Sequence, residues 1–172
     1  MNIEIICIGT LKEAYFREAE KEYLKRLAPY CKVCVTELRE TRLPKDAGST
    51  EEENVRRSEG SALLSAALIT KGGGAANRKE SGGAYVFALD MRGRQHSSEK
   101  FAENIQKLAT HGKSTFVFLI GGSLGLSEDV RENADAVLSF SELTFPHQLM
   151  RVILLEQLYR AQKILRGEPY HK

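Results

Sequence analysis

Two short segments of this chain are apolar along nearly their whole length, and they constrain the fold more than any other feature. Ala84–Asp90 reads AYVFALD, and Thr115–Ile120 reads TFVFLI. A strand with one solvated face alternates apolar and polar residues, whereas a strand that is buried on both faces does not. These segments therefore predict central strands of a parallel sheet that is covered on both faces.

The rest of the chain alternates strand-like and helix-like segments, which indicates an α/β fold. Three further strands are expected at Ile3–Ile8, Lys32–Leu38 and Ala136–Phe140. Helices are expected at Leu11–Leu27, at about 50–68, from Ser97 or Ser98 to about Thr110, in a short segment opening at Ser127, and at Pro146–Arg166. Ser49 followed by Glu52 matches a capping box, and Met91–Arg94 reads as a turn.

Length and composition predict a single domain over residues 1–172. We expect no membrane among its partners. Residues 71–83 hold five of the fourteen glycines and read as a flexible surface insertion. The chain lacks an apolar run of transmembrane length, and its N-terminus lacks the basic region of a signal peptide, so we expect a cytoplasmic protein. Because 25 Lys and Arg stand against 23 Asp and Glu, a nucleic-acid surface must be a local patch.

The three cysteines predict neither a disulfide framework nor a metal site. Their number is odd, so they cannot all pair. Cys31 and Cys34 match the C-x-x-C spacing, but they lie in a β-branched, alternating segment, where positions i and i+3 point to opposite faces. We interpret them as structural thiols and expect no bound metal.

Two loops are candidates for a ligand site. Gly121–Gly125 follows a buried strand, and open α/β sheets bind ligands at the carboxyl ends of their strands. Its G-G-x-x-G spacing matches neither the dinucleotide fingerprint nor a P-loop, so a ligand turn and a tight structural turn are equally good interpretations. Ser141–Pro146 offers backbone amides and carbonyls rather than a charged cage, which suits an adenosine or a thioether-like group better than a triphosphate.

The last predicted helix points to a homodimer. Val152–Leu155 places four apolar residues in one turn, on every side of the helix. One domain covers a single side, so we expect a second copy to cover another. Glu156 and Arg160 have the i, i+4 spacing of an ion pair or of an ordinary solvated contact. Residues 146–172 carry five Lys and Arg against two acids, and the chain ends in Pro169–Lys172.

Taken together, these motifs resemble one family of RNA-modifying enzymes. The segments are SELTFPHQLMR at 141–151, EQLYRA at 156–161, PYHK at 169–172, LIGGSLG at 119–125, VFALD at 86–90 and IICIGT at 5–10. They resemble the bacterial large-subunit ribosomal RNA pseudouridine methyltransferase H family, within the SPOUT superfamily. The resemblance covers nearly the whole chain, and the departure from it is residues 71–83, which look longer and more glycine-rich than the family's usual connection.

The resemblance implies a SPOUT-type parallel sheet flanked by helices, with a C-terminal trefoil knot, in a homodimer. It implies an S-adenosylmethionine site at Leu89, Gly121, Ser141, Glu142, Leu143, Thr144, Phe145 and Pro146, with no metal. The implied reaction is methylation of N3 of a pseudouridine, in a stem-loop of large-subunit rRNA within the assembled ribosome, and DNA is not an expected partner. The N3 proton must be removed, and residue type and expected proximity make His171, Arg160 and Tyr170 the candidates.

Two other functions stay open on the residues alone. A non-catalytic ribosome-binding factor would not need the donor-site loop Ser141–Pro146. A nucleotide-binding oxidoreductase would need a dinucleotide fingerprint, and the glycine spacing at 121–125 does not provide it.

Overall fold

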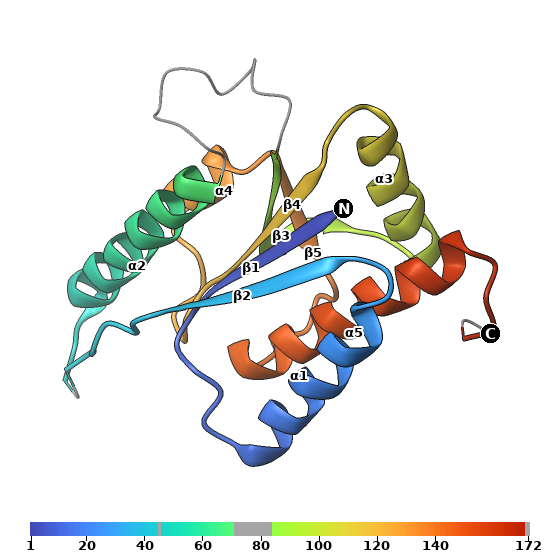
Figure 1. Cartoon of the computed structure of the whole chain (residues 1–172). Helices are drawn as coiled ribbons and strands as arrows, with labels where there is room; N and C mark the ends of the chain where they lie inside the picture. The colour runs from blue at the N-terminus through green and yellow to red at the C-terminus, as the bar shows by residue number, and fades with distance from the viewer. Residues whose placement is uncertain (45, 71–83, 171–172) are drawn as a thin grey trace.

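The computed structural model describes residues 1–44, 46–70 and 84–170, whose strands form one parallel sheet in the order β2-β1-β4-β3-β5 (Figure 1). The strands are β1 (Asn2–Ile8), β2 (Lys32–Leu38), β3 (Ala84–Gln95), β4 (Thr115–Ile120) and β5 (Ala136–Ser139). The helices are α1 (Ala14–Leu27), α2 (Ser49–Thr70), α3 (Ser98–Thr110), α4 (Glu128–Asn133) and α5 (His147–Leu165).

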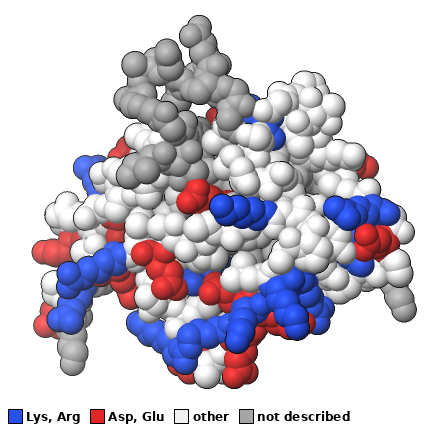
Figure 2. All heavy atoms as spheres, viewed as in Figure 1, with Lys and Arg blue, Asp and Glu red and all other residues white. Residues whose placement is uncertain are grey.

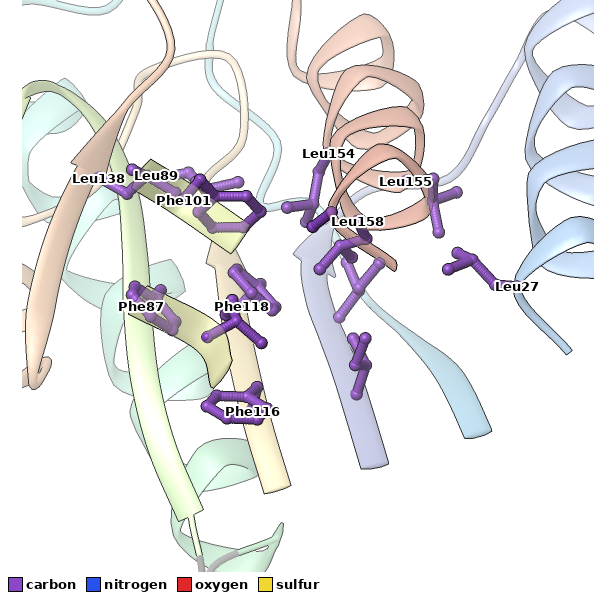
Figure 3. Close-up of a cluster of buried hydrophobic side chains, with 14 of the residues drawn as sticks. Leu27, Phe87, Leu89, Phe101, Phe116, Phe118, Leu138, Leu154, Leu155 and Leu158 are labelled. Carbon is purple, nitrogen blue, oxygen red and sulfur yellow. The ribbon is translucent and has the colours of Figure 1, made fainter. Parts of the chain in front are cut away.

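Helices cover both faces of the sheet, as the apolar strands predict. Helices α2 and α4 lie on one face, and α1, α3 and α5 on the other (Figure 1). Along β4, Phe116 and Phe118 point into the core beneath α3 and α5, whereas Val117 and Leu119 point into the core beneath α2 and α4. Figure 3 shows the larger core, in which Phe118 stacks on Phe87 of β3 with ring centroids 5.0 Å apart.

Charged side chains are mixed rather than segregated on the face seen in Figure 2. Basic and acidic atoms are interspersed along its lower edge, where α1 lies in Figure 1. Within the described ranges, no helix is both long enough and apolar enough to cross a membrane.

The predicted turn at Met91–Arg94 is wrong, because β3 continues to Gln95. A register shift between Leu89 and Arg94 carries the strand along β5. Gly93 makes this path possible, since a Cβ there would lie 2.6 Å from the carbonyl carbon of Leu138.

Other boundaries move by a few residues. The first helix begins at Ala14, three residues later than expected. The capping box is wrong by one position: the Gly48 amide donates to the Glu51 carboxylate over 3.0 Å, so Ser49 is already helical.

The cysteines are free, with Cys31 buried. The insertion at 71–83 lies outside the described residues, and both the trefoil knot and the single-domain organisation stay predictions.

Candidate active site

A cavity of about 910 Å³ opens where β4 and β5 end and where the pairing of β3 with β4 ends, at Leu89. The carboxyl edge of a parallel sheet is the usual ligand position in open α/β folds. Seven of the eight residues predicted to bind the donor line this cavity: Leu89, Gly121, Ser141, Leu143, Thr144, Phe145 and Pro146. The eighth, Glu142, does not line it.

The glycine turn is tight, and it also forms a wall of the cavity. Gly122 and Gly125 form an antiparallel bridge, and the Gly125 amide donates to the Gly122 carbonyl over 3.1 Å. Gly125 has a φ of 76°, which favours glycine. A Cβ on Gly121 would lie 2.7 Å from the Gly125 carbonyl carbon. The chain therefore needs glycine at position 121 for its own packing, whatever the cavity holds.

Two arginines from different helices hold this turn. Arg56 of α2 donates to the carbonyl of Leu124 over 3.1 Å. Arg131 of α4 donates to the carbonyl of Leu126 over 2.6 Å, and it pairs with Asp90 over 3.1 Å. Sequence reasoning missed both arginines, because an arginine within a charged helix reads as a solvated residue. Asp90 lies within the VFALD motif, which is a signal that could have found it.

The cavity combines apolar walls with charges of both signs. The charged lining consists of three carboxylates and three guanidiniums, from Glu53, Asp90, Glu128, Arg56, Arg92 and Arg131. Two large apolar side chains of the lining are strongly exposed, Leu143 at 71% and Met91 at 56%. Among the residues that the structure describes, no group of three His, Cys, Asp or Glu side chains is placed to hold a metal ion.

The loop that leads into α5 is held by its own side chains. Ser139 donates to the carbonyl of Ser141 over 2.9 Å, and the Leu143 amide donates to the Ser141 hydroxyl over 3.0 Å. The next residue of the lining beyond Pro146 is His147, the first residue of α5. Burial holds the pKa of His147 below its usual range, so the ring is mostly neutral near pH 7.

A buried arginine fixes the first half of α5 to the sheet. The Arg151 side chain is 2% exposed, and it contacts Glu37 over 2.6 Å and Glu20 over 3.1 Å. It also donates to the carbonyl of Gly9 over 3.1 Å. Arg151 and His147 both lie in the SELTFPHQLMR motif, so the sequence contained a signal for them, but it did not indicate their contacts.

Two of the three candidates for proton removal, Arg160 and Tyr170, lie away from the cavity of their own chain. Arg160 and Tyr170 do not line it. Arg160 follows His147 by thirteen helical residues, a separation of about 20 Å along α5. Within one chain Arg160 and Tyr170 are therefore not next to the donor loops, and His171 lies outside the described residues, so the role of all three in proton removal stays a prediction.

Arg160 and Tyr170 instead meet at one carboxylate. Arg160 donates from Nε to Glu156 over 3.0 Å, which confirms the ion pair over the solvated alternative. The Tyr170 hydroxyl donates to the same carboxylate over 3.2 Å. Burial is the main reason that the pKa of Tyr170 rises to about 12, so its phenol stays protonated at neutral pH.

The chain itself covers part of the apolar turn that pointed to a dimer. Leu154 and Leu155 are fully buried against the sheet and neighbouring helices, as Figure 3 shows. Val152 and Ile153 are half-buried. Two of the four residues thus need no second copy, and the homodimer stays a prediction that rests on the other two.

Comparison with known proteins assigns this fold and site to a class of methyltransferases. The chain belongs to the SPOUT methyltransferase family, since the family described as "Predicted SPOUT methyltransferase" matches residues 1–171. Among solved structures, a probable methylase family protein from Haemophilus influenzae Rd KW20 has a similar fold. Its TM-score is 0.51 at 15% identity, over 99% of this chain and 70% of that one. These matches confirm the predicted SPOUT-type α/β fold.

Curated relatives match the chain over its full length. Three of them carry the name ribosomal RNA large subunit methyltransferase H. The chain is 51% identical to the protein of Clostridium novyi (strain NT), 49% to that of Bacillus cytotoxicus, and 47% to that of Alkaliphilus oremlandii (strain OhILAs). Each alignment spans 172 residues and covers 100% of both chains.

Proposed function

We propose that this protein transfers the methyl group of S-adenosylmethionine to N3 of a pseudouridine in a stem-loop of large-subunit rRNA. The substrate is the assembled ribosome in the cytoplasm, and DNA is not a partner. Family membership and the names of the full-length relatives support methylation of rRNA. One observation carries the donor site: the three segments that the sequence motifs assign to it border a single cavity.

The lining suits the chemical groups of the donor. Apolar side chains such as Leu89, Leu138 and Phe145 offer contacts to an adenine ring, and the polar loop at 141–146 offers backbone groups. Carboxylates and guanidiniums in the same lining match the amino and carboxylate groups of the methionine part. When bound, the sulfonium supplies an activated methyl group, so the protein needs to orient the reactants, exclude water and accept a proton.

The proton acceptor comes from a second copy of the chain in this proposal. Because Arg160 lies about 20 Å along α5 from the start of the helix, and neither Arg160 nor Tyr170 lines the cavity of its own chain, the tail of one chain serves the cavity of its partner. There His171 removes the N3 proton, and Arg160 stabilises the resulting anion. A phenol whose pKa is about 12 is a poor base near pH 7, so Tyr170 stacks on an exposed base instead. The exposed Leu143 and Met91 support a partner surface at the mouth of the cavity.

The test compares rRNA from a strain that lacks this gene with rRNA from the strain after the gene is restored. Mass spectrometry should find one pseudouridine that loses its methyl group and regains it. Purified protein should also methylate ribosomes from the deletion strain when S-adenosylmethionine is added. Unchanged rRNA in the deletion strain would contradict the proposal, and binding of NAD(H) without S-adenosylmethionine would favour an oxidoreductase.

A further inference from the structure

The segment that follows α5 is folded back onto the helix. Gly167 has a φ of 63°, and its amide donates to the carbonyl of Ile164 over 3.0 Å. The Glu168 amide then donates to the carbonyl of Lys163 over 2.9 Å. This pattern of bonds after a positive-φ glycine is a common helix ending, and here it directs the chain back along α5.

A first anchor holds Glu168. Its carboxylate accepts a bond from the Tyr30 hydroxyl over 2.7 Å and a charged bond from Lys163 over 2.5 Å. The Lys163 side chain is 14% exposed, so this ion pair is partly shielded from solvent. Tyr30 follows α1 in the chain, which ties the returning segment to a second helix region as well as to α5.

A second anchor holds Tyr170. Its ring packs edge-on against Tyr159, with centroids 4.8 Å apart, and the guanidinium of Arg160 lies 4.8 Å from the same ring. Glu156 accepts bonds from both the Tyr170 hydroxyl and Arg160. One carboxylate therefore fixes the phenol and also the cation that lies against its ring.

We propose that Glu156 and Tyr159 are positioning residues, which hold the C-terminal tail through Tyr170 in the orientation that methyl transfer needs. This inference rests on the proposed function. His171 directly follows Tyr170 in the sequence. A displacement of about 1 Å in a reacting group can cost about 100-fold in rate. Fixing Tyr170 limits that displacement, while neither Glu156 nor Tyr159 touches the reacting atoms.

The experiment tests separately the ring of Tyr159, the hydroxyl of Tyr170 and the charge of Glu156. Tyr159→Leu removes the packing surface, and its matched control Tyr159→Phe keeps the ring. Glu156→Gln weakens both bonds at the carboxylate, and Tyr170→Phe removes a single hydroxyl. Methyl transfer to ribosomes that lack the modification gives kcat and KM, calorimetry gives the affinity for S-adenosylmethionine, and hydrogen exchange reports the mobility of residues 166–172.

We expect faster exchange of the tail in Tyr159→Leu, Glu156→Gln and Tyr170→Phe. The kcat should fall about 100-fold in Tyr159→Leu and about tenfold in Glu156→Gln. Tyr159→Phe should retain most of the wild-type kcat. Donor affinity should not change, because the residues that line the donor cavity do not include Glu156, Tyr159 or Tyr170. Should Tyr159→Leu fail to fold, Tyr170→Phe tests the same anchor with the loss of one oxygen atom.

Three results would overturn the inference. The first is faster exchange of the tail with an unchanged kcat, and the second is a lower kcat with unchanged exchange. The third is a parallel loss of donor affinity, which would indicate general damage to the fold. Wild-type protein that transfers no methyl group would instead overturn the proposed function, while hydrogen exchange would still report whether the anchors hold the tail.

Discussion

Replacing Gly121 with alanine should deform the turn that borders the cavity. A Cβ at this position would lie 2.7 Å from the carbonyl carbon and oxygen of Gly125, and 3.1 Å from Cδ2 of Leu126. The two shorter contacts are to backbone atoms, so a side-chain rotation cannot relieve them. The bridge between Gly122 and Gly125 must therefore shift, and it carries one wall of the cavity with it.

The clash should remove a substantial part of the free energy of unfolding. Adding a carbon to a tightly packed site costs about 1–3 kcal/mol, against a total of about 5–15 kcal/mol for an ordinary domain. The free energy of unfolding of Gly121→Ala should fall by about 2 kcal/mol. The displaced wall should lower donor affinity at least about tenfold, which corresponds to about 1.4 kcal/mol of binding free energy.

Gly112→Ala is the matched control for a loss of stability without damage to the cavity. Gly112 follows α3, has a φ of 87°, and has open space where a Cβ would lie. The left-handed conformation should cost alanine about 1–2 kcal/mol, while donor affinity stays at the wild-type value. Urea denaturation and calorimetry measure the two quantities. Wild-type donor affinity in Gly121→Ala would refute the role of the turn in binding.

Two further predictions concern the thiols and the assembly. The exposed Cys34 should react rapidly with a thiol reagent at pH 7. Cys7 and Cys31 should react slowly, because burial raises the pKa of each thiol to about 11. Rapid reaction of all three thiols would contradict this prediction. Since both values lie above the ordinary 9.0, the stability contributed by the two neutral thiols is complete below pH 9 and is lost as pH rises toward 11. Ile153→Asp should reduce the sedimenting mass from two chains to one, since Ile153 is only half-buried in a single chain, and an unchanged mass would argue against this interface. Leu155→Asp should unfold the chain instead, because Leu155 is buried within it.

The sequence predicts the extent of β4 well and the end of β3 less well. Thr115–Ile120 is the observed extent of β4, because a strand buried on both faces leaves an unbroken apolar pattern. The end of β3 was not predictable in this way, since residues 91–95 are mostly polar and read as a loop. They form a strand because Gly93 lets β3 approach β5, and that contact depends on a residue more than forty positions away. A trefoil knot is also beyond pattern reasoning, because local periodicity does not record how a chain passes through a loop.

The candidate site was predictable where it follows from strand order. Leu89, Gly121 and the loop at 141–146 gather at one edge, because the carboxyl ends of neighbouring parallel strands meet there. The side chains that hold the glycine turn in place were not predictable. Arg56 and Arg131 reach carbonyls of the glycine turn from helices on one face of the sheet, and nothing in the helical pattern distinguishes them from solvated arginines.

The length of α5 leads to the sharpest test of a site shared between two chains. Its first turn borders the cavity, its middle is buried in the core, and its second half carries Glu156 and Arg160. Arg151 anchors the helix to Glu37 of β2 and to the carbonyl of Gly9, just after β1. If a partner supplies the tail, a chain with Gly121→Ala and a chain with His171→Ala should complement each other. Half of randomly mixed dimers would pair one of each, with one intact site of two, so activity should reach about a quarter of the wild-type value. The assay uses S-adenosylmethionine at a concentration below the Kd of the wild-type protein, so that each variant alone has little activity. A mixture no more active than the separate variants would show that each chain works with its own tail.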